Sequence, residues 1–287
     1  MNAPPSHHPS RRPILVTGAH RSGTTFAGRI LAESPLLRYI DEPFNVNHGT
    51  CACGAAFTYW FQYVTESSGP LLQRHLQHII ADCDSPLSTR ALVKDPIAVF
   101  SAEWLARTFT MDVIVLIRHP AAFAASLKRL NWKFSFAQLL GQNMLMRDHL
   151  QPFAREIRDH AAHTKDIIEQ AALLWRIIYS VVDGYRSRHP DWHFVRHEDL
   201  SRNPVSVFRN LCRGLSVAFT NGMRSRILEY TGSGNPSAAP QGEPHVLKLN
   251  SASAVWNWKK QLSSSEIRSI RDACYDVSAL FYSDEDW

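Results

Sequence analysis

The residues best suited to chemistry lie in a short glycine-containing stretch, ILVTGAHRSGTTF at residues 14–26. Its apolar start predicts a buried strand and its end a helix, so several backbone N–H groups point to one place at the positive end of the helix dipole. The spacing of Gly18 and Gly23 is that of a phosphate-binding loop, but Thr24 stands where nucleotide triphosphatases carry lysine. The stretch predicts an anion site that lacks the usual cation.

The loop itself must therefore supply the positive charge. Arg21 lies two positions before Gly23, and a guanidinium keeps its proton and holds oxyanions as a fork. Thr24 and Thr25 add hydroxyl donors. A glycine turn without a ligand is the alternative, and this stretch taken alone favours neither.

A second stretch, VIVLIRHPAAFAASLKR at residues 113–129, has the same organisation. An apolar strand ends at Arg118, Pro120 suits the first turn of a helix, and Ser126 follows two turns later on nearly the same face. Arg118 and Ser126 together are predicted to bind a second, separate phosphate. For either residue singly, a structural role such as a salt bridge is the alternative.

With these two motifs the chain resembles the sulfotransferases that use 3′-phosphoadenosine 5′-phosphosulfate (PAPS). GAHRSGTT is similar to the family's loop for the 5′-phosphosulfate, in the Arg-Ser-Gly form typical of bacterial and carbohydrate enzymes, and RHPAAFAAS is similar to its 3′-phosphate motif. The resemblance extends over about residues 13–282 through VKDP, VRHEDLSRNP and WNWKKQLSSSEIRSI, and is weak at residues 44–88. Within it, the HEDL segment at residues 197–200 is assigned a structural role.

The resemblance implies PAPS as co-substrate, its desulfated form PAP as product, and no metal. Two anion sites at the carboxyl ends of strands, separated by room for a nucleoside, suit such a donor independently of the family. The predicted donor-binding residues are His20, Arg21, Ser22, Gly23, Thr24, Thr25, Arg118, Ser126 and Lys248.

Glu42, which ends the apolar run in YIDEPF, is the expected general base. If its strand lies beside the first strand, its carboxylate reaches the phosphate loop, and the resemblance implies this role because carboxylates at a similar place act as the base in related enzymes. A structural ion pair with Arg21 or Arg38 is the alternative. Asp41 and His48 are the second choices.

Lys94 completes the predicted catalytic set of Glu42, Lys94 and Arg21. It matches the lysine that in relatives stabilises the leaving phosphate, and the alternative is a solvated lysine. Pro96 stands where the cytosolic enzymes place a catalytic histidine, which this chain does not match.

The elements that must position these residues alternate along the chain. Apolar runs at 14–17, 37–41, 91–94, 113–117 and 192–196 are separated by stretches long enough for helices, the clearest at 165–187 with a broad apolar stripe. This order predicts an α/β fold with a P-loop-like, mostly parallel five-stranded sheet flanked by helices on both faces. We expect residues 1–12 to be a disordered tail and residues 13–287 to form a single domain.

Two segments lie outside this pattern. Residues 231–245 are dense in Gly, Ser, Pro and Ala and predict either a loop or a cover over the donor. Residues 44–70 are expected to lie outside the sheet. Seven aromatic residues are candidates for the pocket of an acceptor such as a sugar, a nucleoside or a lipid-like molecule, or else for ordinary core: Phe57, Tyr59, Trp60, Phe61, Trp132, Phe134 and Phe136.

Composition and charge limit the kinds of ligand and the compartment that we expect for this chain. A net charge of +5 on 287 residues, of which 20% are charged, fits one polyphosphate ligand and does not call for nucleic acid. There is no apolar run that would span a membrane, no signal peptide is expected, and an odd set of cysteines favours a reducing, cytoplasmic compartment. A loose zinc-like cluster formed by Cys51, Cys53, His75, His78 and Cys83 is spaced too tightly for a closed site. The competing functions are a P-loop kinase, against which Thr24 argues, and a catalytically inactive nucleotide-binding protein.

Overall fold

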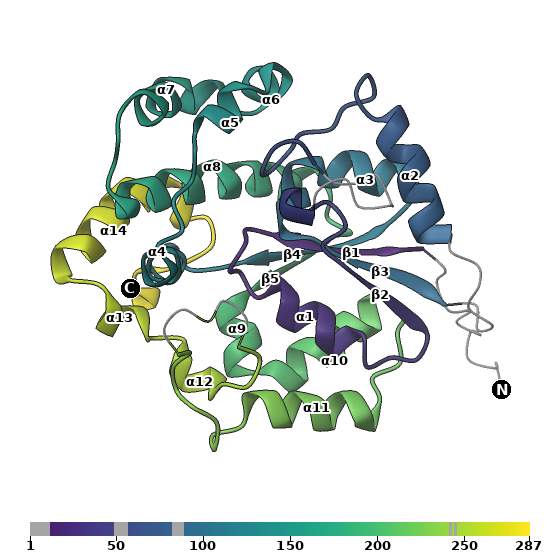
Figure 1. The fold of residues 1–287 in the computed structure, drawn as a ribbon. Coiled ribbons are helices and arrows are strands. Elements are labelled where there is room, and N and C mark those ends of the chain that lie inside the picture. Colours follow the sequence, from purple (N-terminus) through teal and green to yellow (C-terminus); the bar gives the residue numbers. More distant parts are fainter. Residues whose placement is uncertain (1–11, 49–56, 82–88, 241–242, 244–245) are drawn as a thin grey trace.

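A parallel sheet of five strands forms the centre of the computed structural model, which describes residues 12–48, 57–81, 89–240, 243 and 246–287. The strand order is β2-β3-β1-β4-β5, and every neighbouring pair is parallel (Figure 1). The strands are β1 (Ile14–Gly18), β2 (Leu37–Asp41), β3 (Arg90–Lys94), β4 (Asp112–Ile117) and β5 (His193–Arg196). The predicted fold class is therefore confirmed. The predicted tail lies almost entirely outside the described residues.

Alternating side chains of the strands feed two separate hydrophobic clusters. Leu15, Val93 and Val115 belong to the cluster on one face of the sheet, whereas Val16 and Leu116 belong to the cluster on the other. This is the period of two expected when both faces of a parallel sheet are covered. The interior strands β1, β3 and β4 read as mostly apolar runs because neither of their faces meets water.

Helices cover both faces (Figure 1). The smaller cluster contains residues of α1 (Thr24–Leu31), α10 (Pro204–Gly214) and α11 (Asn221–Thr231). The larger contains residues of α3 (Ala102–Phe109), α4 (Pro120–Leu130), α8 (Ile167–Arg188) and α14 (Ser264–Ser278). The other helices are α2 (Pro70–Ala81), α5 (Ala137–Leu140), α6 (Asn143–Asp148), α7 (Ala154–Ala162), α9 (His197–Arg202), α12 (Ser251–Ala254) and α13 (Trp258–Gln261). Among the described helices, none pairs the length with the apolar content that a bilayer-spanning segment needs.

The expectation that the second strand adjoins the first is wrong, because β3 lies between β1 and β2. All five residues of β3 are buried, whereas β2 is only partly buried and ends in an exposed residue. The strand that can be enclosed on all sides occupies the interior position, and the more polar strand forms the edge. Glu42 therefore approaches the phosphate loop across the end of β3, where Lys94 lies.

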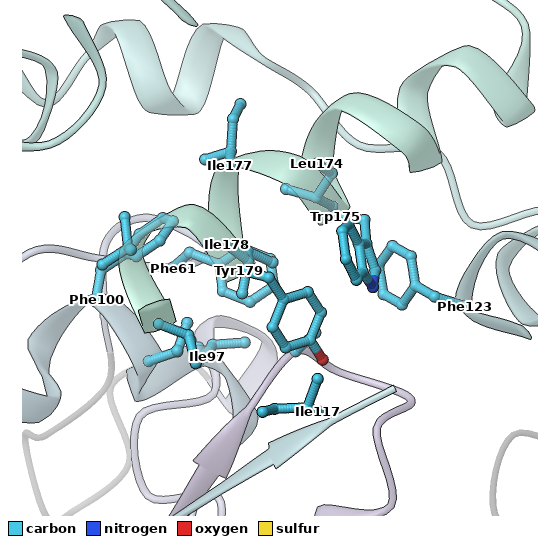
Figure 2. Close-up of a cluster of buried hydrophobic side chains, with 14 of the residues drawn as sticks. Phe61, Ile97, Phe100, Ile117, Phe123, Leu174, Trp175, Ile177, Ile178 and Tyr179 are labelled. Atoms are coloured by element: carbon cyan, nitrogen blue, oxygen red, sulfur yellow. The ribbon is translucent and has the colours of Figure 1, made fainter. Parts of the chain in front are cut away.

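Helix α8 holds the backbone at the end of β4. The Trp175 Nε1 donates a hydrogen bond to the Arg118 carbonyl at 2.7 Å, and the Tyr179 hydroxyl accepts one from the Arg118 N–H at 3.2 Å. Figure 2 shows both rings in the core that packs around Phe123 and Ile117. The apolar stripe predicted for this helix is confirmed as core, and its two polar atoms fix the strand end that carries Arg118.

This anchoring predicts a local effect for Tyr179→Phe. The variant keeps the ring but removes the only hydrogen-bond acceptor that the structure gives the Arg118 N–H, at a cost of about 1–3 kcal/mol in the free energy of unfolding. Amide hydrogen exchange at Arg118 should become faster. Tyr185→Phe is the matched control, because this buried hydroxyl on the same helix donates to Val99 O at 3.0 Å instead. Equal exchange rates at Arg118 in the two variants would contradict the anchoring role.

Candidate functional site

The site lies where the chain leaves two neighbouring strands in opposite directions. From β1 it runs through α1 on one face of the sheet to β2, and from β4 it runs through α4 and α8 on the other face to β5. Such a switch point leaves a crevice at the carboxyl ends of the strands, which is where open α/β sheets bind ligands. A cavity of about 940 Å³ opens there, and residues that follow β1, β2, β3 and β4 line it.

The loop after β1 is shaped by close backbone contacts. A Cβ on Gly18 would lie 2.3 Å from Leu116 O, and one on Gly23 would lie 2.7 Å from His197 Nδ1; both glycines have positive φ, 137° and 96°. Arg21 also adopts a left-handed backbone, with φ of 64°. Non-glycine residues in this conformation cost free energy and concentrate at functional sites.

Most of the predicted donor-binding residues of this loop face the cavity. His20, Arg21, Gly23, Thr24 and Thr25 all line it. Ser22 does not: its Oγ donates to the Ala19 carbonyl at 2.5 Å, which closes the turn from inside. Its side chain holds the loop in shape.

Three guanidinium groups converge on the cavity. Arg21 Nε donates to Ser126 Oγ at 3.1 Å, and Arg118 Nη1 donates to the Arg21 carbonyl. Burial and then the charges of Arg118 and Arg129 lower the pKa of Arg21. Burial and, in smaller part, Arg129 lower that of Arg118, while Glu198 opposes the shift. The Nε of Arg118 is buried without a hydrogen-bond partner. An anion bound here would offset the repulsion among the arginines and would accept the hydrogen bond that Arg118 Nε lacks.

Sequence reasoning did not identify Arg129 as part of this cluster. It lies three residues after Ser126 on α4, so the helical period places the two side chains on neighbouring parts of one face. Arg129 lines the cavity and donates to the carbonyls of Pro240 and Glu243. The spacing from Ser126 was the signal that could have revealed it.

Lys94 contacts both the carboxylates at the end of β2 and the phosphate loop after β1. Its side chain is 1% exposed, and its Nζ lies 2.5 Å from Glu42 Oε1 and 2.6 Å from Asp41 Oδ1. The same Nζ donates to Thr25 Oγ1 at 3.3 Å, at the start of α1. Lys94 is therefore a buried, paired lysine and not a solvated one.

Glu42 pairs with Lys94 and not with the arginines considered from the sequence. Arg38 instead donates to the carbonyls of Ile79 and Ile80. The second carboxylate oxygen of Glu42, Oε2, accepts a hydrogen bond from Asn45 Nδ2 at 2.8 Å. The structure thus places two of the three predicted catalytic residues, Glu42 and Arg21, in the cavity lining. Lys94 lies behind the lining and contacts it through Glu42 and Thr25.

A buried carboxyl group, Asp95, holds the turn that carries Glu42. Glu42 has φ of 48°, and its N–H donates to Lys94 O at 2.7 Å. Asp95 accepts the N–H groups of Phe44 at 2.8 Å and Ile97 at 3.0 Å, so it ties this turn to the start of the next helix. Burial, only partly offset by those two hydrogen bonds, raises the pKa of Asp95 to about 7. Asp95 also lines the cavity.

Two neutral histidines border the arginine cluster. His20 and His197 are half-buried, and their removal from water followed by neighbouring arginine charges lowers the pKa of each to about 3. Each has a buried Nδ1 without a hydrogen-bond partner. The structural role assigned to HEDL holds for Glu198, which accepts hydrogen bonds from His119 N and Tyr282 OH, but His197 lines the cavity. The side chain of His48 lies outside the described residues.

The segment expected to cover the donor runs along the cavity in part. Within residues 231–245, Ala239 lines it, and Val246 and Leu247, which follow the segment directly, line it as well. Lys248 does not line the cavity. Its side chain is 57% exposed, and its Nζ pairs with Glu229 Oε1 at 2.6 Å. Positions 241–242 and 244–245 are not among the described residues.

The zinc-like cluster falls mostly outside the part of the chain that the structure describes. Cys51, Cys53 and Cys83 are not among the described residues, whereas His75 and His78 lie on α2. Within the described ranges, no group of three His, Cys, Asp or Glu side chains is arranged to hold a metal ion.

Comparisons with known proteins place this geometry in context. A model of a sulfotransferase family matches residues 13–221. The sulfotransferase domain from the curacin biosynthetic pathway is similar in structure, with a TM-score of 0.52 and 17% identity over 96% of this chain and 99% of that one. The sulfotransferase domain of the Synechococcus PCC 7002 olefin synthase has a TM-score of 0.51 and 18% identity over 98% of both chains. No curated protein matches the sequence significantly.

The raised pKa of Asp95 predicts how stability changes with pH. Between the usual pKa of 3.8 and about 7, the folded state holds a proton that the unfolded state has released, so this group's contribution to the free energy of unfolding falls as pH rises. Asp95→Asn removes this pH-dependent contribution to the free energy of unfolding. The stability of the variant relative to wild type should therefore increase by up to about 1.4 kcal/mol per pH unit across this window.

Urea unfolding at pH 5, 6, 7 and 8 measures this difference. Exposed Asp191→Asn is the control and should follow the wild-type pH profile. Parallel profiles for Asp95→Asn and wild type would show that Asp95 is ionised in the folded protein throughout.

Proposed function

Since the chain belongs to the sulfotransferase family, as the family match over residues 13–221 shows, we propose that it transfers a sulfuryl group from PAPS to a hydroxyl of a small-molecule or carbohydrate-like acceptor. PAP would be the product. The observation that carries the choice of donor is the convergence of Arg21, Arg118 and Arg129 on one cavity, with a buried Arg118 Nε that lacks a partner.

The two ends of the cation cluster suit the two anionic ends of this donor. Arg21 and the N–H groups at the start of α1 would bind the 5′-phosphosulfate. Arg118 and Ser126 would bind the 3′-phosphate, and Arg129 adds charge on the same side. Thr24 and Thr25 line the cavity at the N-terminus of α1 and can donate hydroxyls, as expected from the sequence.

The contacts of Lys94 support an in-line displacement. Glu42 would accept the proton of the acceptor hydroxyl while that oxygen forms its bond to sulfur and the bond from sulfur to the phosphate oxygen breaks. Lys94, which spans from Glu42 to Thr25 at the phosphate loop, would stabilise the charge that develops on the leaving phosphate. Arg21 would neutralise the transferred group. The resting contact between Lys94 Nζ and Glu42 Oε1, at 2.5 Å, holds the two side chains together.

Calorimetry separates this function from its competitors. We expect PAP to bind in the absence of magnesium and ATP with magnesium to bind much more weakly, because Thr24 replaces the lysine of ATP-binding loops. A preference for ATP with magnesium would favour a P-loop kinase. Binding of PAP without any sulfuryl transfer would favour an inactive nucleotide-binding protein.

The 3′-phosphate assignment predicts a selective loss in two variants. Arg118→Ala and Ser126→Ala should weaken the binding of PAP far more than that of 5′-AMP, which lacks that phosphate. A lost charge-assisted contact costs about 1.5–3 kcal/mol, so PAP affinity should fall roughly 10- to 100-fold for Arg118→Ala. Equal losses for the two nucleotides would place the 3′-phosphate elsewhere.

The base assignment predicts that Glu42→Gln lowers kcat by about 10²–10⁴, with PAP affinity little changed. Glutamine preserves the shape, and Asp41, 2.6 Å from Lys94, keeps the lysine paired in the variant. Lys94→Ala should also lower kcat, through weaker stabilisation of the leaving group. Asp41→Asn is the matched control and should have a smaller effect than either. Normal turnover by Glu42→Gln, together with its loss in His48→Ala or His20→Ala, would reassign the base to a histidine.

A further inference from the structure

The cavity continues beyond the arginine cluster into an aromatic layer. The Trp132 ring lies 5.6 Å from Arg21 Cζ and 6.1 Å from the His20 ring, and His20 lies 5.4 Å from Phe61. Phe134 continues the layer, 5.9 Å from Phe61. These contacts make an apolar wall that begins directly beside the arginine expected to hold the transferred group.

Only some of the aromatic residues considered from the sequence belong to this wall. Trp60, Phe61, Trp132 and Phe134 line the cavity. Phe57, Tyr59 and Phe136 do not line it: Phe57 stacks on Phe44 at 4.6 Å, and Phe136 packs in the core. Phe61 belongs to both, because it lines the cavity yet is only 1% exposed and packs in the core.

Polar side chains at this end of the cavity are largely committed to the protein itself. Asn45 donates to Glu42 Oε2 through Nδ2 and accepts the Asn47 N–H at 3.0 Å through Oδ1. Gln138 accepts the Trp60 N–H at 2.8 Å through Oε1, which leaves one amide donor on this wall. The other polar residues that line this end are exposed and lie at its solvent side: Asn47, Asn131, Lys133 and Ser135.

The few polar groups available at this end of the cavity limit the chemical class of the acceptor. A sugar carries several hydroxyls besides the one that reacts, and each loses free energy when it is buried without a hydrogen-bond partner. An apolar alcohol needs only one polar contact, at its reacting hydroxyl, and gains from every methylene that the aromatic wall removes from water. The wall offers Glu42 for that hydroxyl. The other buried polar groups beside it are Asp95, whose carboxyl oxygens already accept two backbone N–H groups, and the ring Nδ1 of His20.

We infer that the acceptor is a predominantly apolar alcohol, whose hydroxyl meets Glu42 and whose hydrocarbon part packs on Trp60, Phe61 and Phe134. This inference rests on the proposed function and narrows it, because it sets apolar alcohols above carbohydrates. It follows from the layer of aromatic contacts and from the pairing of the amides around it.

The test compares acceptors in an assay of PAP release from PAPS. The series 1-hexanol, 1-octanol and 1-decanol is set against methyl α-D-glucopyranoside and glycerol. We expect kcat/KM to rise about three- to fourfold per added methylene, as burial of each one predicts, and to exceed that of the sugar by at least about 10². Faster sulfation of the sugar, or no dependence on chain length, would overturn the inference.

Two variants of the aromatic wall test whether the hydrocarbon part of the acceptor packs there. Trp60→Ala and Phe134→Ala should lower kcat/KM for 1-decanol about tenfold or more and leave PAP binding unchanged, which also reports that each variant is folded. Tyr275→Ala, at a 58% exposed aromatic residue outside the cavity lining, is the matched control. Unchanged 1-decanol turnover in both wall variants would overturn the inference.

Binding of PAP distinguishes the two levels of the proposal. If wild type fails to bind PAP, the proposed function is wrong and the inference fails with it. If PAP binds but none of the alcohols is sulfated, the acceptor class is wrong while the donor assignment stands.

Discussion

Repulsion among Arg21, Arg118 and Arg129 is the constraint on which the site depends. Buried like charges oppose folding, so the protein must hold them together by other means. It does so through backbone contacts: Trp175 and Tyr179 fix the strand end at Arg118, and Arg118 in turn binds the carbonyl of Arg21. The large hydrophobic cluster beneath α8 supplies the free energy that keeps this arrangement. An anionic ligand would remove the repulsion at no cost in reorganisation.

Charge is segregated across the carboxyl edge of the sheet. The cations follow β1 and β4, whereas the carboxyl groups of Asp41, Glu42 and Asp95 follow β2 and β3. Lys94 contacts both groups of residues: its Nζ forms an ion pair with Glu42 on the acidic side and donates a hydrogen bond to Thr25 at the phosphate loop. This division suits a reaction in which negative charge accumulates on one reactant while a proton leaves the other.

The parts of the site that the sequence revealed were those set by local spacing. Arg21 within its loop and Ser126 two turns after Arg118 follow from turn and helix geometry. The contact between Glu42 and Lys94 depended on strand order, and there the expected adjacency of the first two strands was wrong. His197 and Asp95 went unrecognised because their roles come from partners far along the chain, whereas Arg129 was overlooked although its spacing from Ser126 on α4 is local.

The sequence by itself determined the elements and the chemical types at their ends. The five strands begin and end within one residue of their predicted limits, because the interior strands are apolar runs and each of the five ends at or just before glycine or a charged residue. Only the tertiary structure decided which side chains meet. Strand order placed Lys94 between Glu42 and the phosphate loop, and packing turned Trp60, Phe61 and Phe134 toward the cavity but Phe57 and Phe136 away. The physical reason is that local periodicity sets the face of an element on which a residue lies, whereas long-range packing sets what that face meets.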